Sequence, residues 1–386
     1  MNYIEGLGQK AQKAKKSLAT ASTGQKNEIL TRIAAKLLEN QEQILAENEK
    51  DIANARENGI SETMVDRLRL TPERIQGISD ACIQLTNLED PVGEIIEGST
   101  RPNGMKISKI RVPMGVVGII YESRPNVTVD AASLCIKSGN AAILRGGKEA
   151  ICSNKVLMNT MREAVAQCGF PEDIVQLVED TSREVSTQMM QANGLIDVLI
   201  PRGGAGLIQA VVKNATLPVI ETGTGNCHIY VDATADLAMA VNITDNGKTQ
   251  RPSVCNALET CLVHKDVAEE FLPMLKAKLD EHQVEIRGCE RTAAILGDCV
   301  VPATEQDYAT EFLDYIISIK VVDSVEEAIA HVSKYSTGHS ECIVTESYAN
   351  ARKFQEEVDS ACVYVNCSTR FTDGGEFGLG AEIGIS

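Results

Sequence analysis

Residues 116–144, VVGIIYESRPNVTVDAASLCIKSGNAAIL, decide the fold class of this chain. The segment begins with an apolar run at 116–120 and ends with another at 141–144, and neither run alternates with polar residues. Between them, residues 127–137 have the apolar spacing of a helix. Strands that are apolar on both faces and joined by helices are typical of a parallel sheet covered on both sides. The segment therefore predicts an α/β protein.

The same alternation continues through the rest of the chain in two series. The first series predicts helices at 153–168 and 185–192 and strands at 175–178 and 198–200. The second series starts near Val231 and predicts strands at 261–263, 316–322 and 361–365 and a helix at 267–279. A chain of 386 residues exceeds the usual size of one domain, so we expect at least two.

Helices and a hairpin are expected before the first strand. Apolar residues at three- and four-residue spacing indicate helices from residue 1 to about 90. Thr71 followed by Pro72 resembles an N-cap with proline at the first helical position. The chain alternates apolar and polar residues on either side of Asn103-Gly104, which predicts a β-hairpin turning there.

The composition excludes several classes of protein. A formal net charge of −17 disfavours nucleic-acid binding, because an acidic surface repels phosphates. No apolar run reaches the roughly 20 residues that span a bilayer, so no membrane partner is expected. Twelve cysteines without a C-x-x-C pair, and an N-terminus without an apolar signal core, indicate a reducing cytoplasm. We expect no structural zinc and no other metal site.

The segment 250–256, QRPSVCN, holds the candidate nucleophile, Cys255, where a turn leads into a new element. It lies downstream of an acidic residue, Glu221, in a glycine-punctuated segment. A thiolate nucleophile needs a partly exposed sulfur. Pro252 and Ser253 resemble a helix start, whose N–H groups would lower the thiol pKa from its reference of about 8.5. The alternative is a buried cysteine without a reactive role.

Two glycine-containing turns at strand ends are candidates for binding a dinucleotide. The turn at 201–208, PRGGAGLI, would let the backbone approach a pyrophosphate at a helix N-terminus. The turn at 144–149, LRGGKE, carries two cations that suit an adenosine ribose with a 2′-phosphate. The alternatives are a plain turn and an exposed basic loop. The candidate cofactor-binding residues are Gly203, Gly204, Gly206, Arg145 and Lys148.

Other polar segments allow weaker predictions. Arg124 could hold a carboxylate or phosphate and Asn126 could donate to an oxyanion, or both could belong to an ordinary polar loop. His331 and His339 are eight residues apart, which fits no common zinc pattern, so structural hydrogen bonding is expected. The glycine-rich loop at 373–380 could cap a site or merely turn.

Taken together, these motifs resemble those of the aldehyde dehydrogenase superfamily. Cys255 within QRPSVC, Glu221 within ETGTGNCH and the glycine turn at 201–206 occur in that family's order and spacing. The segment YESRPNVT at 121–128 is similar to the gamma-glutamyl phosphate reductase branch, as are stretches within 322–343 and 371–382. The resemblance covers essentially the whole chain. It implies an α/β, aldehyde-dehydrogenase-like fold of two Rossmann-like parallel-sheet domains with an oligomerisation β-hairpin.

The resemblance also implies an activity. It is the reduction of L-glutamyl 5-phosphate by NADPH to L-glutamate 5-semialdehyde and phosphate, the second step of proline biosynthesis from glutamate. A homo-oligomer and a functional contact with glutamate 5-kinase are expected. The implied roles are catalysis by Cys255, Asn126 and Glu221, nicotinamide-ribose binding by Glu311, and substrate binding by Arg124 and Arg370. The alternatives are another acylating aldehyde dehydrogenase and a non-catalytic relative that keeps the fold.

The resemblance finally implies a domain plan. Residues 1–228 would form the cofactor-binding domain, with the hairpin at about 94–111 and a C-terminal segment at about 368–386 returning to it. Residues 229–367 would form the catalytic domain with the nucleophilic cysteine. Members of the family run on for a few dozen residues past Ser386, including a strand that joins the oligomer. We therefore expect a chain that is truncated or has lost that strand.

Overall fold

The computed structural model describes residues 2–384, apart from the side chains of Thr63 and Ala205. By its internal contacts the chain divides into two compact units, Met1–Thr222 and Gly223–Ser386. No helix in the described part of the chain is long and apolar enough to cross a membrane.

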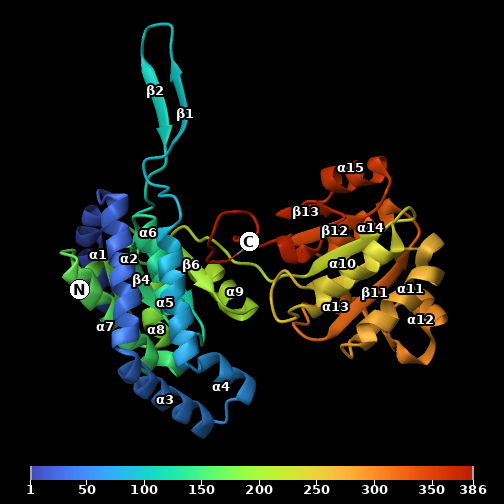
Figure 1. The fold of residues 1–386 in the computed structure, drawn as a ribbon, viewed down its shortest axis with the longest axis horizontal. Coiled ribbons are helices and arrows are strands. Elements are labelled where there is room, and N and C mark those ends of the chain that lie inside the picture. The colour runs from blue at the N-terminus through green and yellow to red at the C-terminus, as the bar shows by residue number, and fades with distance from the viewer. Residues whose placement is uncertain (1, 385–386) are drawn as a thin grey trace. The chain divides into compact units, whose positions relative to one another are not determined.

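The unit Met1–Thr222 is built, within its described residues, on a four-stranded parallel sheet in the order β5-β4-β3-β6 (Figure 1). The central strand β3 is buried along its whole length, as its apolar sequence predicts. Its register places Val117 beside Ala142 on one side and Val198 on the other. The four predicted strands are confirmed as β3 (Val116–Tyr121), β4 (Ala141–Arg145), β5 (Val175–Leu177) and β6 (Val198–Arg202).

Helices surround this sheet and make up the first part of the chain. Thr71 accepts a hydrogen bond from the backbone of Arg74 and Pro72 begins the helix, so the predicted cap is confirmed. The N-terminal helices are α1 (Tyr3–Ala19), α2 (Thr23–Glu39), α3 (Gln41–Glu57), α4 (Glu62–Leu68) and α5 (Pro72–Thr86). The helices between and after the strands are α6 (Asn126–Lys137), η1 (Lys148–Ala150), α7 (Ile151–Gln167), η2 (Glu172–Ile174), α8 (Arg183–Met190) and α9 (Ala205–Asn214).

The predicted hairpin is confirmed and projects from the rest of its unit (Figure 1). Strands β1 (Ile95–Thr100) and β2 (Lys106–Ile110) pair antiparallel, and every residue in both is exposed. Gly104 closes the turn with a positive φ of 83° and donates to the carbonyl of Arg101 at 2.9 Å. The hairpin carries exposed isoleucines that nothing in its own described unit covers.

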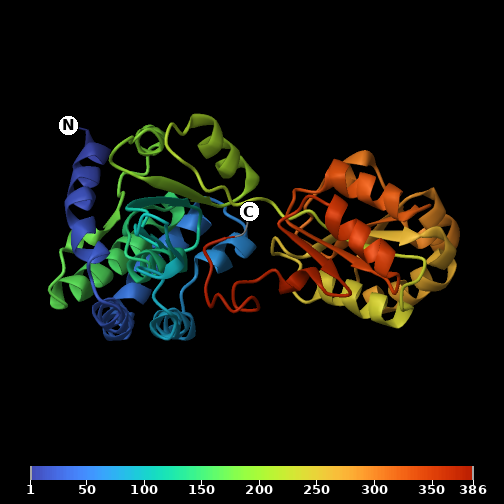
Figure 2. The same ribbon diagram turned by 90° about the horizontal axis from the view of Figure 1, so that it is seen from above.

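The unit Gly223–Ser386 contains, within its described residues, a seven-stranded parallel sheet in the order β10-β9-β11-β8-β7-β12-β13. Helices lie on both sides of it (Figure 2). Alternate residues of β7 show why: Ile229 and Val231 pack into the core that contains Phe271, whereas Tyr230 packs into the core that contains Phe354. The strands are β7 (Cys227–Val231), β8 (Leu258–His264), β9 (Glu285–Gly288), β10 (Val301–Pro302), β11 (Ile316–Val322), β12 (Ser340–Val344) and β13 (Cys362–Val365).

These strands confirm the second predicted α/β series, and the predicted helix at 267–279 lies within α11. The fold is therefore α/β with parallel sheets, as expected. The helices of this unit are α10 (Leu237–Thr249), α11 (Lys265–Asp280), α12 (Glu290–Leu296), η3 (Gly297–Cys299), α13 (Glu305–Tyr308), α14 (Val325–Tyr335), α15 (Tyr348–Glu357) and η4 (Thr369–Phe371).

Candidate active site

Cys255 lies in the loop between α10 and β8 and is partly exposed. The segment before β7 is pressed against its backbone: a Cβ atom on Gly225 would lie 1.4 Å from the carbonyl oxygen of Cys255. The Cys227 thiol donates to the same carbonyl oxygen at 3.2 Å. Close packing and a hydrogen bond from one segment thus hold the main chain of the candidate nucleophile in place.

The helix start predicted at Pro252 and Ser253 is wrong. Residues 252–257 form turns and bends, and the nearest helix in sequence is α10, which ends at Thr249 just before them. Proline and serine also favour turns, and here the turn leads directly into the buried strand β8. The predicted helix start at Pro252 and Ser253 is therefore not available to stabilise a Cys255 thiolate.

Arg370, in η4, lies over the Cys255 loop. Its guanidinium donates to the side-chain oxygen of Asn256 and, at 3.1 Å, to that of Gln250. Asn256 is buried and donates in turn to the carbonyl of Thr372 at 3.0 Å. Burial lowers the pKa of Arg370, and the nearby Arg251 lowers it further. Two cations therefore lie around the candidate nucleophile in an otherwise acidic chain, and sequence reasoning had singled out only one of them.

Glu311 is hydrogen-bonded to the segment that packs on the Cys255 loop. Its Oε1 accepts a hydrogen bond from the backbone N–H of Gly225 at 2.7 Å, and burial raises the pKa of its carboxyl. Two residues later, the N–H of Leu313 donates to Glu259 at 3.2 Å. The segment predicted to bind a nicotinamide ribose is thus fixed to the glycine that packs on Cys255.

Glu259 belongs to a buried ion pair that sequence reasoning missed. Its Oε2 accepts from Lys248 Nζ at 2.6 Å, and both side chains are fully buried. Burial raises the pKa of Glu259 to about 7 and lowers that of Lys248, while their mutual attraction opposes both shifts. Lys248 is on α10 and Glu259 on β8, so the pair joins the two elements that flank the Cys255 loop.

A cavity of about 720 Å³ lies at the carboxyl edge of the four-stranded sheet. Arg145 and Lys148 line it, as do Leu207 on α9 and the acidic side chains of Glu122 and Glu149. Arg145 donates to the carbonyl of Thr181 at 2.9 Å, yet its Nε is buried without a hydrogen-bond partner among the described residues. The volume and the orphaned guanidinium nitrogen fit a phosphorylated cofactor. Arg183 also lines the cavity and had no sequence signal.

The predicted glycine turn joins β6 to α9, and its glycines meet different surroundings. Gly204 is the N-cap of α9, and its N–H donates to Glu122 Oε2 at 2.9 Å. A Cβ on Gly203 would lie 2.7 Å from the same carboxylate, whereas one on Gly206 would meet no described atom within 4 Å. The helix start is confirmed here, and it already holds an anion from its own chain.

Three further predicted residues lie in the unit Met1–Thr222. Arg124 is exposed in the loop after β3, and Asn126 begins α6. The Asn126 amide donates to Asp130 at 2.9 Å, and burial raises the pKa of Asp130 to about 6. Glu221 is exposed in the segment that ends the unit. The roles predicted for these residues stay predictions.

The two histidines have different environments. His339 Nδ1 shares a 2.7 Å hydrogen bond with Ser340, and burial lowers the pKa of His339 to about 4. His331 is also buried, but neither ring nitrogen has a hydrogen-bond partner in the described chain. Its ring instead packs 4.5 Å from that of Tyr335, between centroids. The prediction of structural hydrogen bonding is confirmed for His339. It is wrong for His331, whose ring packs against aromatic side chains instead.

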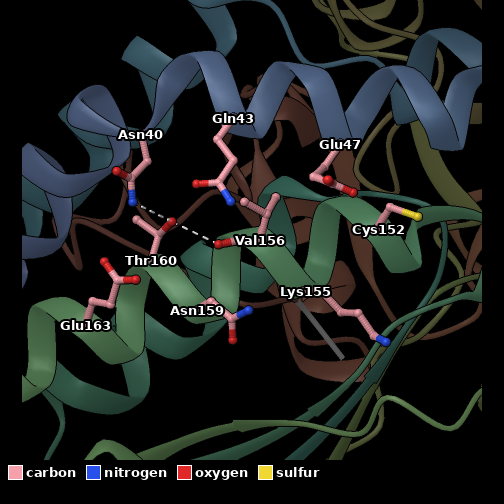
Figure 3. A pocket seen from close by; sticks show the side chains of 9 residues that line it. All are labelled: Asn40, Gln43, Glu47, Cys152, Lys155, Val156, Asn159, Thr160 and Glu163. Carbon is pink, nitrogen blue, oxygen red and sulfur yellow. Dashed lines mark hydrogen bonds between the residues drawn. The ribbon is translucent and has the colours of Figure 1, made fainter.

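A smaller cavity of about 280 Å³ lies between α3 and α7 (Figure 3). Figure 3 shows a polar lining in which Asn40 donates to Thr160 at 3.2 Å. Burial raises the pKa of Cys152 in this groove, and the adjacent Asp51 raises it further, so both disfavour the reactive thiolate form. Cys152 is therefore a poorer candidate for a nucleophile than Cys255.

Comparison with known protein families identifies the class. The aldehyde dehydrogenase family model matches residues 3–297 and 300–380. The chain belongs to the aldehyde dehydrogenase family.

Two highly similar relatives belong to one branch of the aldehyde dehydrogenase family. The chain is 56% identical to a gamma-glutamyl phosphate reductase of Clostridium botulinum (strain Alaska E43 / Type E3), over 100% of this chain and 93% of the relative. A crystal structure of gamma-glutamyl phosphate reductase from Thermotoga maritima matches with a TM-score of 0.98 and 52% identity, over 100% of this chain and 93% of that one. The expected resemblance to the gamma-glutamyl phosphate reductase branch is confirmed.

The wider superfamily shares the fold at much lower identity. An acetylating aldehyde dehydrogenase from Geobacillus thermoglucosidasius matches with a TM-score of 0.66 and 17% identity, over 97% of this chain and 88% of that one. At this identity the likeness shows the fold alone, so it does not favour an acetylating activity here.

Proposed function

We propose that this chain reduces L-glutamyl 5-phosphate with NADPH to L-glutamate 5-semialdehyde and phosphate. The observation that carries the proposal is the full-length similarity to gamma-glutamyl phosphate reductases, at 52% identity to one of known structure. A partly exposed cysteine with Arg370 beside its loop supports it, since attack on a phosphorylated acid needs a sulfur nucleophile and a cation.

The chemistry assigned to Cys255 runs in two stages. Its thiolate attacks the acyl carbon, the bond to the phosphate oxygen breaks, and phosphate leaves, so that a thioester forms on Sγ. The nicotinamide, when bound, supplies the hydride that reduces the thioester carbon. The resulting thiohemiacetal on Cys255 collapses to the aldehyde and returns the thiolate. The rigid Gly225–Cys255 contact keeps the sulfur in place through both stages.

Other side chains are assigned supporting roles. An oxyanion on the acyl oxygen would be stabilised by the backbone N–H near Cys255 and by Asn126, and one such donor is typically worth roughly 3 kcal/mol. Arg124 and Arg370 are assigned to the substrate's negative groups. Glu221 is assigned proton handling or positioning. In this reaction water competes with hydride for the thioester, so Glu221 does not act as a hydrolytic base.

The cavity of about 720 Å³ is the proposed cofactor site. Arg145 and Lys148 there favour the 2′-phosphate of NADP. Gly203, Gly204 and Gly206, at the start of α9, are assigned to the pyrophosphate. Glu311 would bind the nicotinamide ribose. These assignments go with a cofactor-binding domain over 1–228, to which 368–386 would return, and a catalytic domain over 229–367.

The proposed function also includes contacts with a second copy of the chain and with another enzyme. The hairpin at about 94–111 would pair with a second copy of the chain, because its exposed isoleucines need a cover. A functional contact with glutamate 5-kinase is proposed because an acyl phosphate hydrolyses readily in water.

The test is the reverse reaction. NADP⁺ reduction is followed with glutamate 5-semialdehyde, with and without phosphate, for the unaltered chain and for Cys255→Ser. We expect a phosphate-dependent rate that is lost in Cys255→Ser, while NADP⁺ binds both proteins alike. A rate that needs CoA in place of phosphate would indicate another acylating aldehyde dehydrogenase. NADP⁺ binding without any turnover in the unaltered chain would indicate a non-catalytic relative.

A further inference from the structure

The first N–H of helix α9 is occupied by the chain's own carboxylate. Glu122, the residue after β3, reaches across the carboxyl edge of the sheet and accepts from Gly204 at 2.9 Å. Its carboxylate also lies against the α-carbon of Gly203, where a Cβ would come within 2.7 Å. An anion thus sits where the positive end of a helix and an open glycine backbone favour one.

The same carboxylate belongs to the proposed cofactor cavity. Glu122 lines it together with the cations Arg145, Lys148 and Arg183. A pyrophosphate group that used the Gly204 N–H would have to displace Glu122, and the two anions would repel each other at close range. Gly203 and Gly204 have no side chains, so either a phosphate or the Glu122 carboxylate can approach the backbone at the start of α9.

We propose that Glu122 is an internal competitor for the pyrophosphate subsite and sets the cofactor affinity of this chain. This inference rests on the proposed function, since it requires a nicotinamide dinucleotide in this cavity. In the absence of cofactor, Glu122 accepts the hydrogen bond from the Gly204 N–H at the start of α9. When cofactor binds, its phosphate takes the Gly204 N–H and the carboxylate moves into solvent, to which Glu122 is already exposed. The displacement weakens binding and speeds release of the cofactor.

The test compares Glu122→Gln with a matched control, Glu149→Gln. Both variants remove one negative charge from the same cavity, but of the two carboxylates only that of Glu122 binds the α9 turn in the described structure.

Dissociation constants for NADP⁺ and for inorganic pyrophosphate are measured by titration calorimetry at low ionic strength. For Glu122→Gln we expect about tenfold tighter binding of both ligands, or ~1.4 kcal/mol. The gain should shrink at 0.5 M salt because salt screens the repulsion. Adenosine, which lacks phosphate, should bind both variants and the unaltered chain alike.

The outcomes separate this inference from the proposed function. If the unaltered chain and both variants fail to bind NADP⁺, the proposed function itself is wrong. If the unaltered chain binds NADP⁺ and Glu122→Gln binds it equally or more weakly, the inference about Glu122 alone is overturned. Equal tightening in Glu149→Gln would also overturn it, because the effect would then come from the net charge of the cavity and not from the contact with Gly204.

Discussion

Gly225 shows how a single residue without a side chain can position a nucleophile. Any Cβ at this position would overlap the Cys255 carbonyl, at 1.4 Å, and also its carbonyl carbon, at 2.3 Å. Backbone atoms cannot move aside as the end of a flexible side chain can, so the two loops would have to separate. The N–H of Gly225 also donates to Glu311, so such a shift would disturb the proposed ribose-binding carboxylate as well.

Gly225→Ala should therefore abolish most turnover while the chain still folds. We expect a loss of at least about 100-fold in kcat, because a displacement of about 1 Å at a reacting group has effects of this size. The matched control is Gly223→Ala, since a Cβ there meets no described atom within 4 Å and the residue has no positive φ. Steady-state kinetics of both variants test this, and similar kcat values for the two would contradict the proposed role of the contact.

The buried Lys248–Glu259 pair gives a second prediction at this scale. Lys248→Met leaves the Glu259 carboxylate fully buried, with the Leu313 N–H as its remaining hydrogen-bond donor among the described residues, so the unfolding free energy should fall by about 3–5 kcal/mol. Urea unfolding of the full chain measures this loss. The double variant Lys248→Met/Glu259→Gln should regain at least half of it, because the remaining amide is neutral and still accepts from Leu313. No recovery would mean that packing, and not charge, dominates at this site.

Among the elements, the β1–β2 hairpin has no packing partner in its own described unit. Ile95 is 67% exposed, as is its cross-strand partner Ile110 at 51%, and Ile107 further along the hairpin is also exposed. A two-stranded hairpin is only marginally stable alone in water. Its alternating sequence was enough to predict the strands and the turn, but an alternating pattern normally buries one face, and the structure shows both faces exposed.

We expect the double variant Ile95→Glu/Ile107→Glu to dissociate the proposed homo-oligomer, because the substitutions place charges on the surface that a second copy would cover. Light scattering after size exclusion measures the mass. Tyr348→Glu is the control, since Tyr348 is 79% exposed on α15 and far from the hairpin in sequence. An unchanged oligomer in the hairpin variant, or a monomeric unaltered chain, would refute an oligomerisation role.

Element boundaries show where local sequence misleads. The Pro252–Ser253 pair has the composition of a helix start, but the next four residues lead directly into the buried strand β8. The β6–α9 turn has a similar signal followed by ten helical residues, and there the helix exists. A helix start needs an apolar-periodic segment behind it, because helix stability comes mainly from packing of that segment.

At the scale of the whole molecule, the two units have separate cores, and acid should act differently on them. The unit Gly223–Ser386 buries His331 without hydrogen-bond partners among its described residues, and this burial lowers the pKa of His331 to about 2. The usual value near 6.5 returns on unfolding. The folded-state pKa is thus depressed, so the stability contributed by uncharged His331 is complete above pH 6.5 and is lost as the pH falls below it.

The cost from His331 alone should approach about 1.4 kcal/mol per pH unit as the pH falls well below 6.5. Between pH 6.5 and 5.0, we expect His331→Phe to lose roughly 2 kcal/mol less unfolding free energy than the unaltered chain. Phenylalanine keeps the ring contacts with Tyr308 and Tyr335. Urea midpoints followed by circular dichroism at both pH values provide the measurement, with His282→Phe on the surface as the control. Parallel acid losses in all three proteins would contradict the assignment.

The sequence alone determined the α/β class, the order of strands and helices, the hairpin, the two glycine turns and the family. These features depend on apolar periodicity and on residues close together in the chain, where the physics of helices, strands and turns acts locally.

Only the tertiary structure decided how the sites are built. Glu122 meets Gly204 across 82 residues, Glu311 meets Gly225 across 86, and Arg370 meets Asn256 across 114. No local pattern predicts such contacts, because they form only when packed sheets bring distant loops to the same edge. The surroundings of a glycine or a carboxylate, and therefore its chemistry, are set by those distant neighbours.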